Sequence, residues 1–141
     1  MTHKSGKVAE RVAHLQGCAL DPRYLGFFEC FNQGYFYEAH DVLEDLWLEC
    51  RKGEKDLFYK ALIQLAGAFV HLQKDRIRPS GRLFRLSRGY LCSYPETFES
   101  LDLGRVIGII DDWLARLSVV PPGTNPLEGF PSPKIYPCVE Q

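Results

Sequence analysis

One segment of the chain, from about Glu54 to Lys74, is apolar on almost every side of a helix. When successive residues are placed about 100° apart, phenylalanine, leucine, isoleucine, valine and alanine side chains cover its front and both flanks. Within the body of this helix only a narrow strip at i, i+4, i+7 and i+11 is not apolar, and it consists of Lys60, Gln64, Gly67 and His71. Such a helix is stable at the centre of a domain, where neighbouring elements cover its flanks. The rest of the chain must therefore supply elements that surround it.

The chain up to Val119 supplies these neighbours as further helices. Apolar residues recur three and four positions apart in segments at about residues 7–16, 22–33, 35–51, 80–93 and 105–119, and a short helical turn is expected at 96–101. Asp21–Pro22 is a typical helix start, and Gly34 suits the left-handed conformation that ends a helix. With no strand pattern and no long repeat, the sequence predicts an all-α fold, a compact array of about five to six helices in one domain over residues 1–119.

The last part of the chain, residues 120–141, differs in kind. It holds six of the nine prolines, so it cannot be helical over any length. It also carries Leu127, Phe130, Ile135, Tyr136 and Val139, which a purely solvated tail would not need. We therefore expect a proline-rich extended segment that packs on the helices of the same domain.

Composition excludes several classes of protein. The 141 residues carry 17 basic and 18 acidic side chains, so no global field draws the chain to nucleic acid or to a membrane. The sequence contains no run of 18 apolar residues, so we expect no transmembrane helix. The start of the chain leads into no export signal. The five cysteines are an odd number without a C-x-x-C pair, which favours reduced thiols. We expect a cytoplasmic protein with no membrane partner, and we leave a homo-oligomer open.

A second polar strip lies on the preceding helix. His40, Glu44, Trp47 and Arg51 have the same spacing as the strip on the 54–74 segment. Only a few residues join the two helices, so they should form a central antiparallel pair. In that arrangement His40 and Glu44 lie level with the stretch from Gln64 to His71, and Trp47 lies nearer the connection. The candidate ligand-binding residues are His40, Glu44, Trp47, Gln64 and His71.

Several interpretations of this polar seam remain open. Two histidines and a carboxylate, His40, Glu44 and His71, suit a divalent transition metal such as zinc or iron. The same groups suit a small-molecule pocket or acid–base chemistry, in which Glu44 tunes a histidine. Without a ligand, the strip is either a hydrogen-bond network that orients two helices or a face in water. The spacing decides neither whether the protein is an enzyme nor which cofactor it holds.

The same residues carry a family resemblance. The stretches from Phe31 to Trp47 and from Ala61 to His71 resemble the two leading motifs of the family called domain of unknown function 309, and Gly81 with Leu83 fits a weaker third element. The resemblance covers about residues 27–90. It implies a small, mostly prokaryotic all-α array without an established activity, and it implies that the five candidate residues belong to the family pattern. The chain departs from that pattern at Asp41, Ala61 and the step Lys74-Asp75-Arg76.

A basic face follows the central pair. Six bases lie between Lys74 and Arg88, and Arg78, Arg82 and Arg85 can share one side of a helix. Arginine is well suited to a phosphate or another anion. RNA or a nucleotide could also bind at residues 76–88. It is a weaker candidate than a small anion because the chain is not basic overall. The alternatives are ion pairing with the acids between Glu38 and Asp56, and a helical protein-interaction module of the tetratricopeptide type, although no repeat follows.

Overall fold

The structure, a computed structural model, describes residues 8 and 20–138 of the chain. Within these residues it consists of helices α2 (Pro22–Asn32), α3 (Phe36–Glu49), α4 (Asp56–Gln73), α5 (Ile77–Leu91) and α6 (Leu103–Val119), strands β1 (Thr97–Phe98) and β2 (Leu101–Asp102), and a short 3-10 turn, η2 (Pro126–Glu128). The all-α prediction is confirmed. The predicted helix at 7–16 lies outside the described residues. No helix in the described part of the chain combines the length and the apolar character needed to cross a membrane.

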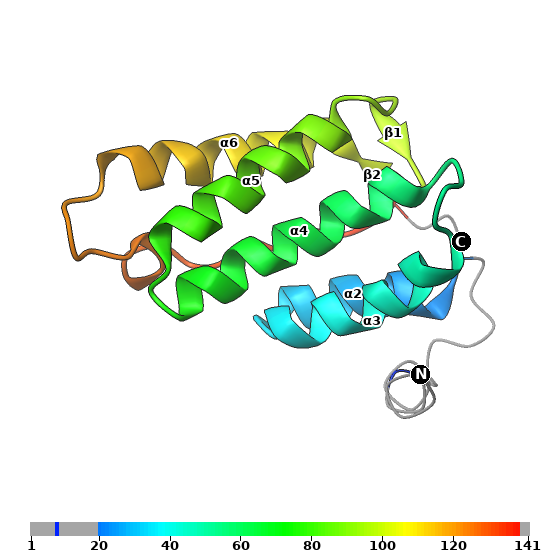
Figure 1. The fold of residues 1–141 in the computed structure, drawn as a ribbon, viewed down its shortest axis with the longest axis horizontal. Coiled ribbons are helices and arrows are strands. Elements are labelled where there is room, and N and C mark those ends of the chain that lie inside the picture. The colour runs from blue at the N-terminus through cyan, green and yellow to red at the C-terminus, as the bar shows by residue number, and fades with distance from the viewer. Residues whose placement is uncertain (1–7, 9–19, 139–141) are drawn as a thin grey trace.

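Helix α4 lies at the centre of the array, with α2 and α3 on one side and α5 and α6 on the other (Figure 1). Ten of its 18 residues are buried. The ring of Phe69 contacts one aromatic ring from each of the other four described helices, with centroids between 4.8 and 5.7 Å apart. The four partners are Phe31, Phe36, Phe84 and Trp113. Helix α4 is apolar on almost every side because other helices pack on both of its flanks, as predicted.

Local signals place the ends of α2 as predicted. The Asp21 carboxylate caps the helix by accepting from the backbone amide of Arg23 at 2.8 Å. At the other end Gly34 has a φ of +81°, which glycine adopts without strain. The amide of Tyr35 then donates back to the carbonyl of Cys30 at 2.9 Å, which closes the helix. The chain turns sharply there and enters α3 antiparallel to α2.

Helix α5 begins at Ile77, three residues earlier than the predicted start at Ser80. Pro79 falls within the first turn, where a backbone N–H has no partner inside the helix and the fixed φ of proline is compatible with helical geometry. Proline therefore does not mark the boundary here. The earlier start brings Arg78 onto the helix with the other arginines.

The expected helical turn at 96–101 is wrong, and so is the expectation of no strands. Strands β1 and β2 form an antiparallel pair in which Phe98 lies opposite Leu101. Between them Glu99 and Ser100 have φ values of +51° and +56°, as in a two-residue hairpin turn. Leu101 is fully buried, and the ring of Phe98 packs against two aromatic rings of the core. Burial of these two side chains explains a hairpin that local sequence did not indicate.

The proline-rich C-terminal segment runs back across the helices in an extended conformation, interrupted by η2 (Figure 1). Near its start, Asn125 donates to the carbonyl of Leu72 at 2.5 Å, at the end of α4. Further along, Asn32 donates to the carbonyl of Ile135 at 2.8 Å and accepts from its amide at 2.7 Å. The Ile135 side chain is 1% exposed and belongs to the main hydrophobic core.

Candidate functional site

A hollow of about 260 Å³ lies between α3, α4 and α5. It contains three of the five predicted ligand-binding residues, and we call it the histidine hollow. Its lining consists of Tyr37 and His40 from α3, Ile63, Gln64, Gly67, Val70 and His71 from α4, and Leu83 from α5. The polar strip of α4 thus faces a concave surface next to α3. Helical spacing and the short connection predicted that His40, Glu44, Gln64 and His71 converge, and all of these except Glu44 line the hollow.

Gly67 allows α5 to lie close to α4 at the base of this hollow. A Cβ atom placed on Gly67 would be 3.0 Å from Cδ1 of Leu83, which is closer than packed carbon atoms normally lie. Any side chain at this position would therefore push Leu83 aside. The glycine in the polar strip serves helix packing and leaves the hollow open between Gln64 and His71.

Two polar atoms of the lining residues are buried without a hydrogen bond. Gln64 Oε1 and His71 Nδ1 are sealed from solvent, and neither has a hydrogen-bond partner among the residues that the structure describes. Leaving a buried polar atom unpaired costs roughly 1–3 kcal/mol. These two side chains therefore do not form the self-satisfied network that was one interpretation of the seam.

His71 is held in its neutral form. Burial lowers its pKa from the ordinary 6.5, and the positive charges of Arg76, Lys74 and Arg82 lower it further. A neutral imidazole carries one N–H donor and one acceptor nitrogen. At neutral pH His71 can therefore bind an uncharged polar group without first losing a proton.

His40 lies on the opposite wall with a carboxylate on each side. Its Nδ1 is 3.4 Å from Asp41 Oδ1, and its Nε2 is 3.8 Å from Glu44 Oε2. The ring of Tyr37 is stacked beside it, with centroids 6.3 Å apart. Glu44 is not among the residues that line the hollow, and it borders the hollow only through its contact with His40.

Trp47 lies outside the hollow, at the connection between α3 and α4. Its indole N–H donates to Asp56 Oδ1 at 2.7 Å, and the amide of Lys52 donates to Oδ2 of the same carboxylate at 2.8 Å. These bonds, the Lys52 amide first, hold the pKa of Asp56 below its ordinary value. The guanidinium of Arg51 lies over the indole ring at 5.4 Å from its centroid. Trp47 therefore fixes the turn that keeps the two helices antiparallel.

The region from α2 into α5 is the part shared with known proteins. Residues 24–83 match the family described as domain of unknown function (DUF309). The resemblance seen in the motifs is thus confirmed over this range. An uncharacterized protein of Aquifex aeolicus (strain VF5) is 23% identical over 89 residues, which cover 63% of this chain and 27% of that protein. The chain therefore spans only about a quarter of that relative.

The DUF309 match includes every residue that lines the histidine hollow, from Tyr37 to Leu83. Tyr37, Ile63, Val70 and Leu83 were not among the predicted site residues. Leu83 comes from a third helix, which a comparison of two helical wheels cannot include. The third element of the family pattern, which contains Leu83, was the available signal for it.

A metal site at His40, Glu44 and His71 gains no support from the geometry. Among residues 8 and 20–138, no group of three or more histidine, cysteine, aspartate or glutamate side chains is arranged so that it could hold a metal ion. His40 and His71 share a hollow, but the carboxylates beside His40 do not complete a ligand set with His71. Four coordinating atoms around one point, as structural zinc requires, are not brought together.

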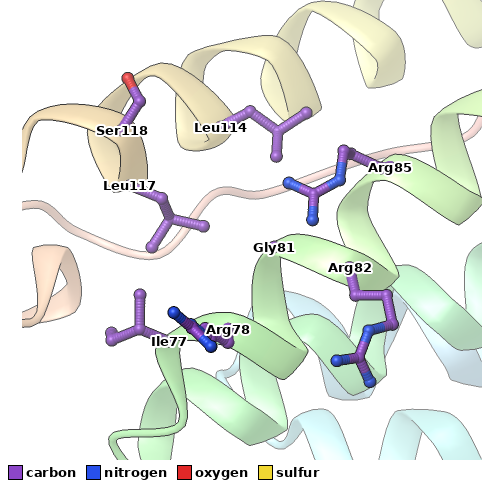
Figure 2. A pocket seen from close by; sticks show the side chains of 8 residues that line it. All are labelled: Ile77, Arg78, Gly81, Arg82, Arg85, Leu114, Leu117 and Ser118. Atoms are coloured by element: carbon purple, nitrogen blue, oxygen red, sulfur yellow. The ribbon is translucent and has the colours of Figure 1, made fainter.

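The three predicted anion-binding arginines line a different hollow, between α5 and α6 (Figure 2). We call this space of about 340 Å³ the arginine hollow. Its lining consists of Ile77, Arg78, Gly81, Arg82 and Arg85 from α5 and Leu114, Leu117 and Ser118 from α6. Arg85 and all of α6 lie beyond the DUF309 match. The sequence predicted the arginines but not the apolar wall that faces them.

Proposed function

We propose that this protein binds a small molecule in the histidine hollow, through hydrogen bonds to Gln64 and His71 and apolar contacts with the surrounding walls. The observation that carries the proposal is the burial of Gln64 Oε1 and His71 Nδ1 without partners. Each such atom destabilises the free protein by roughly 1–3 kcal/mol. Because both atoms are sealed from solvent, a ligand supplies the missing hydrogen bonds once these two side chains turn toward the hollow, and it then recovers part of this free energy.

The chemistry of the walls limits the ligand. Ile63, Val70 and Leu83 offer only apolar contacts, and the volume of about 260 Å³ is slightly below the range of roughly 300–1,000 Å³ found for ligand pockets. The carbonyl oxygen of Gln64 can only accept, so the ligand must provide an N–H or O–H group there. The proposed ligand is therefore a small, largely apolar molecule with a hydrogen-bond donor.

His40 adds a second imidazole to the lining of the hollow. It extends from α3, and the carboxylates of Asp41 and Glu44 lie next to its two ring nitrogens. His71, which burial and nearby positive charges keep neutral, lies on the other wall. Together the two imidazoles can donate hydrogen bonds to a ligand and accept hydrogen bonds from it.

Phenol and toluene provide a direct test, because they have similar shapes and differ in one O–H donor. Titration of isotope-labelled protein, followed by amide chemical shifts, should show that phenol perturbs the residues around the hollow and binds more tightly than toluene. One recovered hydrogen bond corresponds to about a threefold to tenfold difference in Kd. Binding of neither probe, or equal binding of both, would contradict the proposal.

Two matched substitutions on α4 locate the effect. In Gln64→Leu the acceptor is gone, so the preference for phenol over toluene should disappear while toluene binding is kept. Gln73→Leu makes the same change on the same helix outside the hollow, where the Gln73 amide donates to the carbonyl of Gly34 at 3.1 Å. That control should keep the preference. Loss of the preference in both variants, or in neither, would refute the assignment to Gln64.

A further inference from the structure

The arginine hollow combines three guanidinium groups with an apolar wall. Figure 2 shows the side chain of Arg85 reaching into the space between α5 and α6, with Leu114 and Leu117 on the opposite side. Arg78 lies in the first turn of α5 and Arg82 one turn further on. No acidic residue is part of the lining. Positive charge therefore borders an open, concave surface whose other half is hydrocarbon.

The three guanidinium groups form no ion pair with the described residues, in contrast to those of Arg23 and Arg88. Arg88, on the same helix, donates to both carboxylate oxygens of Asp111 at 2.6 and 3.2 Å. Arg23 donates to three carboxylates, among them Glu49 at 2.6 Å. The acids of α3 pair with Arg23 and His40, and Asp56 at the start of α4 accepts from Trp47 and Lys52. These contacts do not include the arginines of the hollow. They therefore give no support to the alternative in which the basic face pairs with those acids.

Gly81 keeps the floor of the hollow open. A Cβ atom built on this buried residue would lie 3.4 Å from Nη1 of Arg85 and 3.9 Å from Cδ1 of Leu117. Without that carbon, the guanidinium of Arg85 lies directly against the helix backbone, and α6 approaches from the other side. A side chain at Gly81 would fill the space between the charged and the apolar half of the hollow.

We propose that the arginine hollow binds the phosphate group of a small organophosphate whose apolar part packs on Leu114 and Leu117. Arginine forks donate paired hydrogen bonds to phosphate oxygens, and several unpaired guanidinium groups suit a dianion better than a carboxylate. The first turn of α5 adds the positive end of a helix dipole on the same side. A concave shape with an apolar wall favours a small molecule over the backbone of a nucleic acid, which would use the charge but not the hydrocarbon.

Hexyl phosphate, inorganic phosphate and hexanol separate the two halves of the site in a calorimetric titration at low salt. Hexyl phosphate should bind at least about tenfold more tightly than inorganic phosphate, because its chain buries several methylene groups, and hexanol should not bind measurably. Equal affinities of hexyl phosphate and inorganic phosphate would refute the apolar subsite. No binding of either phosphate would refute the proposal as a whole.

Substitutions on α5 test the residues. Arg85→Gln should weaken hexyl phosphate binding about tenfold or more, since a hydrogen bond to a charged group is lost. Arg105→Gln, which removes the same charge at the distant start of α6, should leave the affinity unchanged. Equal losses in both variants would show that net charge alone attracts the anion and would overturn the proposed site.

Two glycine substitutions, one at the floor of the hollow and one away from it, test the space beside Arg85 without a change of charge. Gly81→Ala should weaken binding of hexyl phosphate, because its Cβ occupies the floor beside Arg85. Gly89→Ala makes the same change on the same helix, where a Cβ would have no heavy atom within 4 Å, and should not alter binding. Unchanged affinity in Gly81→Ala would overturn the site. A single-stranded RNA oligomer that binds more tightly than hexyl phosphate and loses affinity in Arg85→Gln would overturn the small-molecule assignment in favour of nucleic acid.

Discussion

Two serines of α5 provide a matched test of what an unpaired buried polar atom costs in this protein. Ser80 and Ser87 lie two helical turns apart, and both are 0% exposed. The hydroxyl of Ser87 donates to the carbonyl of Ala61 at 2.8 Å, whereas the hydroxyl of Ser80 has no hydrogen-bond partner in the described part of the chain. Replacing each by alanine changes the same atom in the same helix. Only the hydrogen-bonding state differs.

The expected effects have opposite signs. Ser80→Ala removes an unsatisfied hydroxyl, worth roughly 1–3 kcal/mol, and gains about 0.5 kcal/mol of helix propensity. The loss of packing around one oxygen atom offsets part of this, so the free energy of unfolding should rise by about 1–2 kcal/mol. Ser87→Ala loses a hydrogen bond worth about 1 kcal/mol and gains the same propensity, so stability should fall by about 0.5–1 kcal/mol. The two variants should therefore differ by roughly 2 kcal/mol.

Urea unfolding followed by far-ultraviolet circular dichroism measures both changes, with equal m-values as the sign that only stability has changed. In a thermal scan the same difference corresponds to about 6–8 °C in Tm for a domain of this size. If Ser80→Ala is as destabilising as Ser87→Ala, the Ser80 hydroxyl is not a liability. The cost assigned to Gln64 and His71 in the histidine hollow, which rests on the same principle, would then lose its basis.

Three further predictions concern groups at the site and its supports. Burial lowers the pKa of His71 in the folded protein below 6.5, so on acidification the unfolded chain binds a proton at His71 before the folded protein does. Stability should therefore fall as the pH drops below about 6.5, until the pKa of the folded state is reached. Urea unfolding at about pH 8 and about pH 5 should show a smaller loss for His71→Asn than for the wild type. Trp47→Phe removes the donor to Asp56, so stability should fall by about 1 kcal/mol and the Asp56 pKa, followed by NMR, should rise. Asn32→Ala leaves the amide and carbonyl of Ile135 unpaired, so stability should fall by about 2–3 kcal/mol. Hydrogen exchange of the Ile135 amide should become faster. Unchanged exchange would show that the C-terminal segment is held by other contacts.

The fold followed from the sequence where periodicity and local end signals agreed. The central position of α4 was evident from its apolar flanks, and the cap at Asp21 and the turn at Gly34 marked the ends of α2. The β hairpin was missed because two of its turn residues, Glu99 and Ser100, adopt positive φ values without glycine or asparagine. Its strands are two residues long, too short for alternation to be visible. Burial of Leu101 and packing of Phe98, which are tertiary effects, determine this element.

The candidate site was predictable only as far as two neighbouring helices determine it. The equal spacing along α3 and α4 and the short connection were sufficient to predict that His40, Gln64 and His71 lie close together. The same reasoning assigned Trp47 to the site, but its indole N–H is used by Asp56, and a hydrogen bond across a connection leaves no trace in periodicity. Leu83, Leu114 and Leu117 come from helices whose position relative to α4 depends on packing, so their contribution to the two hollows could not be read from the sequence.

The two hollows also differ in what the family match implies. All residues that line the histidine hollow fall within the DUF309 match at 24–83. The arginine hollow needs Arg85 and the wall of α6, which lie outside that range. Helix α5 separates the two spaces: Leu83 borders one, and Gly81 borders the other. The proposed small-molecule site therefore rests entirely on the matched stretch, whereas the proposed phosphate site also needs a helix beyond it.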